Sequence, residues 1–277
     1  MSARISRRFT ALKTEKRAGL IAYMMAHDPD ADTALDILRA LPAAGADLIE
    51  IGFPFTDPMA EGPSIQKASE RALKAGGSLK GTLELVRRFR ENDADTPVIL
   101  MGYCNPVETM GAEAFAAAAK TAGADGAIIV DLPPEEDIDV REALGSQGLS
   151  LIRLATPTTD DARLPTVLEG VTGFLYYVSV TGVTGGQAIG VAAAEVAVAR
   201  LKRATDLPVA VGFGVRDTAA AAAMARVADA VVIGSAFVDE IAKASATGDP
   251  AVGAVVGAVV AKVKELSEAV RGARLSK

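Results

Sequence analysis

The chain has few of the residues on which several classes of protein depend. Among its 277 residues there are one cysteine, Cys104, and one histidine, His27, and there is no tryptophan. A single cysteine excludes a disulfide framework within the chain, and one cysteine with one histidine cannot build a zinc site of the thiolate or multi-histidine kind. We therefore expect no metal centre and a reducing compartment.

Charge and hydropathy exclude two further classes. The formal net charge is −6 and aromatic residues make up 4% of the chain, whereas nucleic-acid surfaces are basic and carry aromatic platforms. The longest apolar stretches have the length of a strand or are broken by Gly, Asp or Arg, so none suits a bilayer span. The arginine-rich first residues lack the apolar core of a secretion signal. These absences predict a cytoplasmic protein without a nucleic-acid or membrane partner.

What the chain does contain is a regular alternation of strand and helix patterns. Half of the residues are hydrophobic, and no linker-like segment divides residues 1–277, which predicts one domain. Apolar β-type runs recur at Leu20–Ala26, Leu48–Phe53, Pro97–Tyr103, Ala127–Leu132, Leu151–Ala155, Phe174–Ser179, Pro208–Gly214 and Ala230–Ala236. Helix-type segments lie between them, at Ala31–Ala43, Ser64–Lys74, Leu79–Glu91, Ala112–Ala122, Glu135–Leu144, Val191–Ala204 and Thr218–Val227.

This alternation predicts an α/β protein with a parallel sheet. Several strands are apolar on both faces, as sheets covered by helices require, and eight strand–helix units in about 250 residues match a closed (β/α)8 TIM barrel. An open, doubly wound sheet is the alternative fold. An extra N-terminal helix at Thr10–Arg17 is positioned to plug the bottom of the barrel, and a helix within Pro250–Leu275 closes the ring.

Two carboxylates stand out in the segment Leu48–Gln66. Glu50 lies inside an apolar run and shares a strand face with Leu48 and Gly52. Burial of an ionised carboxylate is costly unless the group is paired, protonated or used in chemistry. Glu61 follows on a loop rich in proline. The two glutamates predict an acid and a base of different pKa at the mouth of one site. The structural alternative is an ion pair between Glu50 and an arginine.

Glycine-rich turns form the second candidate feature. They are GVTGG at Gly182–Gly186, VGFG at Val211–Gly214 and IGSA at Ile233–Ala236. In (β/α)8 barrels the active site lies at the carboxyl ends of the strands, and a phosphate site after the last two strands is frequent. Glycines let main-chain N–H groups approach an anion closely, although tight turns also use glycine for steric reasons. Together the three turns indicate a phosphate site.

The remaining polar candidates keep a structural interpretation beside a chemical one. His27 and Cys104 follow predicted strands, where packing is the simpler role for each. Asp131 is either an active-site acid or a capping residue. Tyr176 lies in an apolar strand, so its hydroxyl must find a partner, either a carboxylate or a main-chain carbonyl. Asp57 is most simply a turn residue on an exposed loop.

The segment IEIGFPFTDPMAEGPSIQKA at Ile49–Ala68 resembles the signature of the tryptophan synthase alpha chain family. Further segments follow in the family's order and spacing: AYMMAHDPD at Ala22–Asp30, MGYCNPV at Met101–Val107, DGAIIVDLPPEE at Asp125–Glu136, LATPTT at Leu154–Thr159, YYVSVTGVTGG at Tyr176–Gly186, VGFGV at Val211–Val215 and IGSA at Ile233–Ala236. The resemblance therefore covers nearly the whole chain. It implies a (β/α)8 barrel lyase that cleaves indole-3-glycerol phosphate to indole and glyceraldehyde 3-phosphate.

The resemblance also implies roles for particular residues. Glu50 corresponds to the acid and base at the reacting carbons, and Glu61 to the carboxylate that accepts a hydrogen bond from the indole N–H. The phosphate-binding positions correspond to Gly185, Gly214, Gly234 and Ser235. The indole pocket corresponds to Met101, Ile128 and Leu154, and Tyr176 lies with them at the substrate. No cofactor is expected in this chain, because the pyridoxal phosphate belongs to the beta chain, the partner in an alpha2–beta2 tetramer.

Three positions depart from the family pattern. The family usually has Asp where this chain has Glu61, and Thr and Gly are common at the positions of Met25 and His27. A glutamate keeps the charge but adds a methylene, and a misplacement of about 1 Å can cost roughly 10²-fold in rate. Two alternatives follow: a subunit that chiefly activates a beta chain, or another sugar-phosphate barrel enzyme. The latter often uses a lysine at a strand end, and the predicted strands contain none.

Overall fold

The computed structural model describes residues 2–178, 190–212, 214–246 and 252–274. In these residues the strands are β1 Gly19–Met25, β2 Leu48–Gly52, β3 Val98–Gly102, β4 Gly126–Ile129, β5 Ser150–Leu151, β6 Leu154–Ala155, β7 Leu175–Val178, β8 Val209–Gly212 and β9 Ala230–Ile233. All pairings between them are parallel, and the order is β5-β4-β3-β2-β1-β9-β8-β7-β6. Neighbours in the chain are therefore neighbours in the sheet.

The two ends of this order meet, because β5 and β6 are two parts of one strand. Only Ile152 and Arg153 separate them, and both residues continue the ladders on either side. The Ile152 N–H donates to the Ala127 carbonyl of β4 (3.0 Å), and the Arg153 carbonyl accepts from the Tyr176 N–H of β7 (3.1 Å). The sheet thus closes into an eight-membered ring, which confirms the (β/α)8 barrel and excludes the open sheet.

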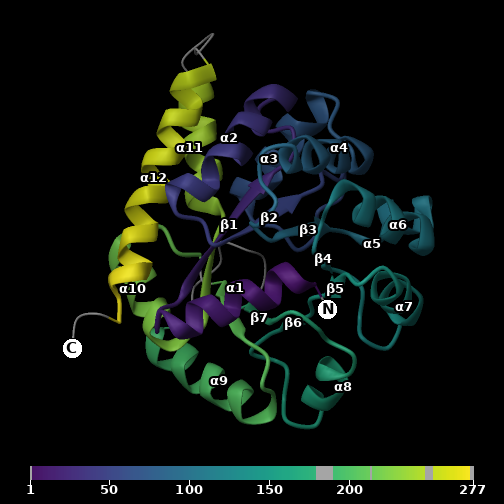
Figure 1. Ribbon diagram of the computed structural model, residues 1–277, viewed down its shortest axis with the longest axis vertical. Helices are drawn as coiled ribbons and strands as arrows, with labels where there is room; N and C mark the ends of the chain where they lie inside the picture. The colour runs from purple at the N-terminus through teal and green to yellow at the C-terminus, as the bar shows by residue number, and fades with distance from the viewer. Residues whose placement is uncertain (1, 179–189, 213, 247–251, 275–277) are drawn as a thin grey trace.

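Apart from α1 (Ala3–Thr14), which lies across the strands, the helices surround this ring (Figure 1). They are α2 Ala31–Ala44, α3 Pro63–Lys74, α4 Leu79–Arg90, α5 Cys104–Met110, α6 Ala112–Ala122, α7 Ile138–Ser146, α8 Leu164–Leu168, α9 Val191–Ala204, α10 Thr218–Val227, α11 Ser235–Ser245 and α12 Val252–Gly272. Local chemistry sets both ends of α2. The Asp30 carboxylate accepts from two N–H groups in the first turn of this helix, and Gly45, at φ +112°, ends it. In the described ranges no helix is both long and apolar enough to cross a membrane.

Several boundaries differ from those predicted. The N-terminal helix begins at Ala3 and ends at Thr14, instead of spanning Thr10–Arg17. The short helices α5 and α8 were not predicted. The last strand was predicted to reach Ala236, but it ends at Ile233 because Ser235 already opens α11. The fifth strand was predicted as one run and is interrupted at Ile152 and Arg153, and the Arg153 side chain pairs with Asp137 of the outer layer.

Two apolar layers hold the barrel together. The larger layer fills the space between the strands and the outer helices. The smaller layer fills the barrel interior, and Ile5, Phe9 and Leu12 of α1 belong to it. The Phe9 ring lies against Phe174, with 5.6 Å between the ring centroids. Helix α1 therefore plugs the bottom of the barrel, where Figure 1 shows it lying across the strands.

A buried carboxylate fastens this plug to the barrel. Asp125 is 2% exposed and accepts four hydrogen bonds, two on each oxygen. The donors are the Ser2 hydroxyl (2.5 Å), the Arg4 guanidinium (3.2 Å), the Arg90 guanidinium (2.8 Å) and the Val98 N–H (2.9 Å). One side chain thus joins α1, α4 and β3.

Replacement of Asp125 by Ala should destabilise the chain strongly, because it leaves the Arg90 guanidinium buried without its carboxylate. We expect a loss of roughly 3–5 kcal/mol in the free energy of unfolding, measured by urea denaturation. The matched control is Asp32→Ala, which removes a carboxylate from an exposed ion pair with Arg88 and should cost well under about 1 kcal/mol. Equal losses in the two variants would contradict the structural role of Asp125.

Candidate active site

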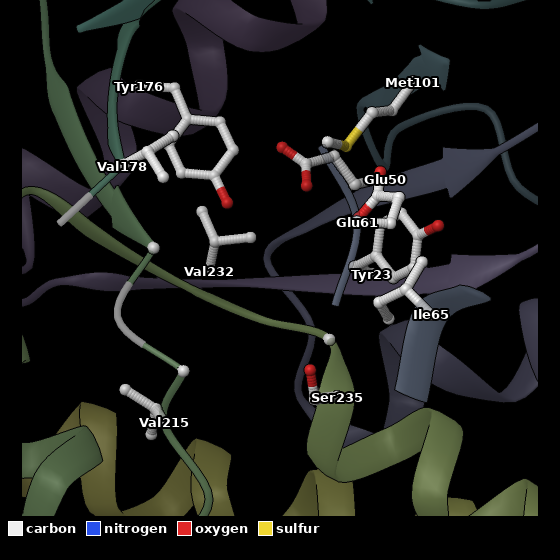
Figure 2. A pocket seen from close by; sticks show the side chains of 13 residues that line it. Tyr23, Glu50, Glu61, Ile65, Met101, Tyr176, Val178, Val215, Val232 and Ser235 are labelled. Atoms are coloured by element: carbon white, nitrogen blue, oxygen red, sulfur yellow. The ribbon is translucent and has the colours of Figure 1, made fainter. Parts of the chain in front are cut away.

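A cavity that is open to solvent lies at the carboxyl ends of the strands. Its described lining, shown in part in Figure 2, consists of Tyr23, Glu50, Glu61, Ile65, Met101, Tyr176, Val178, Gly212, Gly214, Val215, Val232, Gly234 and Ser235. Both predicted carboxylates therefore face one cavity. None of these lining residues is a lysine or an arginine.

Glu50 extends from the middle of β2, which lies between β1 and β3. The residue is 1% exposed, and neither carboxylate oxygen has a hydrogen-bond partner in the described part of the chain. Burial, reinforced by the nearby charge of Glu61, raises the pKa of Glu50 to about 8. At neutral pH the side chain is therefore mostly a neutral carboxylic acid, able to deliver a proton. The alternative of an ion pair with an arginine has no support here.

Glu61 reaches the same cavity from the loop between β2 and α3. It is 6% exposed, and its main chain is fixed at both ends: its N–H donates to the Pro58 carbonyl (3.1 Å), and its carbonyl accepts from Gln66 Nε2 (2.8 Å). The Tyr103 hydroxyl accepts from the Ala60 N–H (3.1 Å) and so fixes the loop one residue earlier. The position of the second carboxylate thus depends on hydrogen bonds within its own loop and on Tyr103, the residue after β3.

Two tyrosines complete the walls around the glutamates. In Figure 2, Tyr176 and Glu50 extend toward one another across the cavity, while Tyr23 lies beside Glu61. Each hydroxyl occupies space that a glycine leaves open: a Cβ on Gly212 would collide with the Tyr176 hydroxyl, and a Cβ on Gly52 with that of Tyr23. Burial, with the charges of the two glutamates, raises the pKa of both tyrosines. Both therefore stay protonated and can donate hydrogen bonds.

Glycine turns form the opposite rim of the cavity. Gly214 has φ +62°, in the left-handed region that favours glycine. Gly234 precedes α11, whose first residue is Ser235, so the first N–H groups of an 11-residue helix lie at this rim. Such a helix end attracts anions. Gly185, the remaining predicted phosphate residue, lies outside the described residues.

The predicted indole-pocket residues separate in the structure. Met101 lines the cavity, whereas Ile128 is fully buried in the barrel interior, in the apolar layer beneath it. Leu154 belongs to the same interior layer and also lines a second hollow, between the β4 loop and α8. The sequence analysis did not select Tyr23, Ile65, Val178, Val215 or Val232, all of which line the cavity. Only Tyr23 carried a signal, as a polar aromatic residue within the apolar strand predicted at Leu20–Ala26.

The other polar candidates lie away from the cavity lining. His27 adopts φ +63°, which explains why glycine is common at this position in the family that the sequence resembles. Asp131 accepts a hydrogen bond from the Cys104 N–H (2.7 Å), consistent with a capping role. Asp57 is exposed on the loop that precedes Glu61. No group of three or more potential metal ligands occurs in the described ranges.

The fold and the cavity define a (β/α)8-barrel protein with a buried acid in a cavity that glycine turns and a helix start also line. Comparison with known proteins gives the family. The family model "Tryptophan synthase alpha chain" matches residues 9–271. The tryptophan synthase alpha chain of Caulobacter sp. (strain K31) is 61% identical over 98% of both chains, and that of Phenylobacterium zucineum (strain HLK1) is 57% identical over 99% of this chain and 98% of the relative.

Solved structures agree with these sequence comparisons. Tryptophan synthase subunit alpha from Legionella pneumophila str. Paris superposes with a TM-score of 0.89 at 38% identity, covering 98% of both chains. A chain of Mycobacterium tuberculosis tryptophan synthase gives a TM-score of 0.87 at 35% identity, covering 98% of this chain and 99% of that one. The chain therefore belongs to the tryptophan synthase alpha chain family, a family of carbon–carbon lyases, which confirms the resemblance in its sequence.

The raised pKa of Glu50 predicts how stability depends on pH. Between its ordinary value of 4.5 and about 8, folded Glu50 keeps a proton that the unfolded chain releases. The stability that this proton contributes is therefore fully present below pH 4.5 and is lost as pH rises toward about 8. Glu50→Gln cannot ionise, so at pH 8 it should be more stable than the parent chain by on the order of 1–3 kcal/mol.

Thermal unfolding from pH 5 to pH 9 measures this difference. The gap between Glu50→Gln and the parent chain should widen as pH rises, whereas the exposed control Glu113→Gln should follow the parent chain throughout. A gap that is constant over this range would contradict the burial of Glu50 as a neutral acid.

Proposed function

We propose that this chain cleaves indole-3-glycerol phosphate to indole and glyceraldehyde 3-phosphate, with Glu50 as the principal acid and base. The observation that carries the proposal is a fully buried carboxyl group without a hydrogen-bond partner in the described residues, facing a cavity whose opposite rim is made of glycine turns and a helix start. The family supports the reaction, and the geometry supports the assignment of roles.

Cleavage of the bond between indole C3 and the glycerol carbon requires two proton movements. A proton is added to C3. The hydroxyl on the glycerol carbon that is bonded to C3 loses a proton as that carbon becomes an aldehyde. The electron pair of the broken bond returns to the ring. Glu50 is protonated at neutral pH because burial raises its pKa, so it can donate to C3 and, once ionised, accept the hydroxyl proton. Proton transfer by a positioned group typically contributes about 10²- to 10⁴-fold.

Glu61 has a different task in this proposal. Protonation at C3 develops positive charge at the ring nitrogen, and a carboxylate that accepts a hydrogen bond from the indole N–H stabilises that charge. Glu61 is positioned for this role by the fixed main chain of its loop. Its negative charge also raises the pKa of Glu50, so the two carboxyl groups divide into an ionised and a protonated member.

The two ends of the substrate bind in different parts of the cavity. The phosphate is bound by main-chain groups at Gly214 and Gly234 with the Ser235 hydroxyl, to which the family pattern adds Gly185. The indole ring lies against apolar residues, with Met101 and Tyr176 at the cavity wall and Ile128 and Leu154 below it. This division leaves the scissile bond beside Glu50.

We also propose that the whole chain forms one (β/α)8 barrel domain.

The partner in this proposal is a tryptophan synthase beta chain, which carries pyridoxal phosphate and consumes the indole. The exposed loop at Asp57 and Met59, close in sequence to Glu61, suits such a contact, since Met59 is 68% exposed. An alpha2–beta2 tetramer in the cytoplasm is the assembly and location that we propose. The pyridoxal phosphate belongs to the partner, so this chain needs no cofactor for its own reaction.

Conservative variants of Glu50 test the reaction directly. Glu50→Gln removes the proton donor and Glu50→Asp withdraws it by one methylene, so each should lower kcat by at least about 10²-fold. Indole release from indole-3-glycerol phosphate is the measurement, with binding of an inert phosphorylated analogue as the check that the site is intact. Retention of most activity in either variant would disprove the assignment.

Glu61→Gln tests the coupling between the two carboxyl groups. In the parent chain kcat/KM should fall as pH rises through about 8, because Glu50 loses its proton. Removal of the charge at Glu61 lowers the pKa of Glu50, so in this variant the fall should begin at lower pH, along with a lower maximal rate. Glu70→Gln, an exposed neighbour on α3, should leave the profile unchanged. An unshifted profile in Glu61→Gln would contradict the coupling.

A further inference from the structure

Arg216 is a cationic residue beside the glycine rim of the cavity. It directly follows Val215 and comes two residues after Gly214, both of which line the cavity. The described lining contains no lysine or arginine. A phosphate dianion at this rim would therefore meet main-chain and hydroxyl dipoles, and its affinity would depend on the charges that lie just outside the lining.

Two neighbouring helices fix the position of the Arg216 guanidinium. One of its nitrogens donates to the Asp239 carboxylate on α11, and the other terminal nitrogen donates to the Ser64 hydroxyl in the first turn of α3 (3.4 Å). Helix α11 also packs against α3. The guanidinium therefore joins three elements that begin at the barrel mouth: the turn after β8, the helix that starts at Ser235 and the helix that follows the Glu61 loop.

Asp239 places a negative charge close to the proposed phosphate site. It comes four residues after Ser235 on α11, so the two side chains share one face of the helix, with their Cβ atoms about 6 Å apart. Side chains on a helix lean toward its amino end, which here is the glycine rim. An ionised carboxylate at this place repels a phosphate and competes with it for the positive end of the helix.

The other charged residues around this pair have partners of their own. Lys243, one turn further along α11, donates to Glu240 (2.7 Å). Asp217, the residue after Arg216, caps the amino end of α10 with its side chain. In the described part of the chain, the ion pair of Asp239 is made with Arg216 alone. Neutralisation of Asp239 therefore depends on that one residue.

We propose that Arg216 sets the affinity of the chain for the phosphate end of its substrate, by neutralising Asp239 beside the glycine rim. The inference rests on the proposed function, from which it takes the place of the phosphate. The ion pair contributes little to the stability of the fold, because both side chains are partly exposed. Its effect is on binding, since it removes a negative charge from the approach to the rim.

The charges of the pair can be removed one at a time. Arg216→Gln leaves Asp239 without its cation, so KM for indole-3-glycerol phosphate should rise by roughly 3- to 10-fold, while kcat changes by less than about twofold. Asp239→Asn leaves an unpaired positive charge and should lower KM. The double variant carries neither charge, and its KM should return to within about twofold of the parent value.

Controls separate a charge effect from a structural one. Arg87→Gln removes an arginine of similar exposure from an ion pair with Glu84 on α4, and should leave KM unchanged. Arg216→Lys keeps the charge and should keep KM within about twofold of the parent value. Added potassium chloride should reduce the difference between Arg216→Gln and the parent chain, because salt screens exposed charges. Melting temperatures show whether each variant is folded.

Binding of glycerol 3-phosphate, measured by calorimetry, distinguishes a failure of the inference from a failure of the proposed function. Its dissociation constant should follow the same order in the parent chain, the two single variants and the double variant. If Asp239→Asn also weakens binding, or if the double variant binds as weakly as Arg216→Gln, the pair is a structural link and the inference is overturned. Unchanged binding in Arg216→Gln overturns it as well.

The remaining outcomes concern the parent chain. A parent chain that binds glycerol 3-phosphate but releases no indole, alone or with a beta chain, overturns the proposed function and leaves the role of Arg216 in phosphate binding intact. A parent chain that neither binds this ester nor releases indole overturns both.

Discussion

The burial of Glu50 without a compensating charge is the constraint on which the site depends. Apart from Glu61, the other buried carboxylates of the described residues each have an arginine partner: Asp28 pairs with Arg71, Asp47 with Arg17, Asp125 with Arg90 and Asp137 with Arg153. Glu50 has no such partner in the described residues and faces another glutamate instead. The chain thus accepts an electrostatic cost at one position, and that cost keeps the carboxyl group protonated at neutral pH.

The rest of the barrel mouth makes this proton useful. The glycine rim and the start of α11 line the same cavity as the carboxyl groups, so in the proposed complex a substrate bound there by its phosphate presents its other end to Glu50. Binding energy gained far from the reacting atoms then serves to orient them. The two tyrosines limit the freedom of that end, and both fit only because Gly52 and Gly212 lack side chains.

The sequence predicted the barrel because its strands repeat with buried, two-sided apolar patterns, and it predicted Glu50 because a carboxylate inside such a pattern is conspicuous. It did not predict the break in the fifth strand, since the pairing of Arg153 with Asp137 joins residues from separate elements. It extended the last strand over Ser235 because a helix start cannot be distinguished from a strand end in an apolar run. Tyr23 was missed for a similar reason: its neighbours Gly52 and Gly234 come from distant parts of the chain.

The apolar plug formed by Ile5, Phe9 and Leu12 has a consequence for traffic through the barrel. In the described part of the chain the lower end is filled, so a molecule enters or leaves the interior at the upper rim, beside the loop that carries Glu61. Products therefore leave, and the next substrate enters, through the same opening at the upper rim. A protein bound over that opening would control the exchange of substrate and products without touching the reacting atoms.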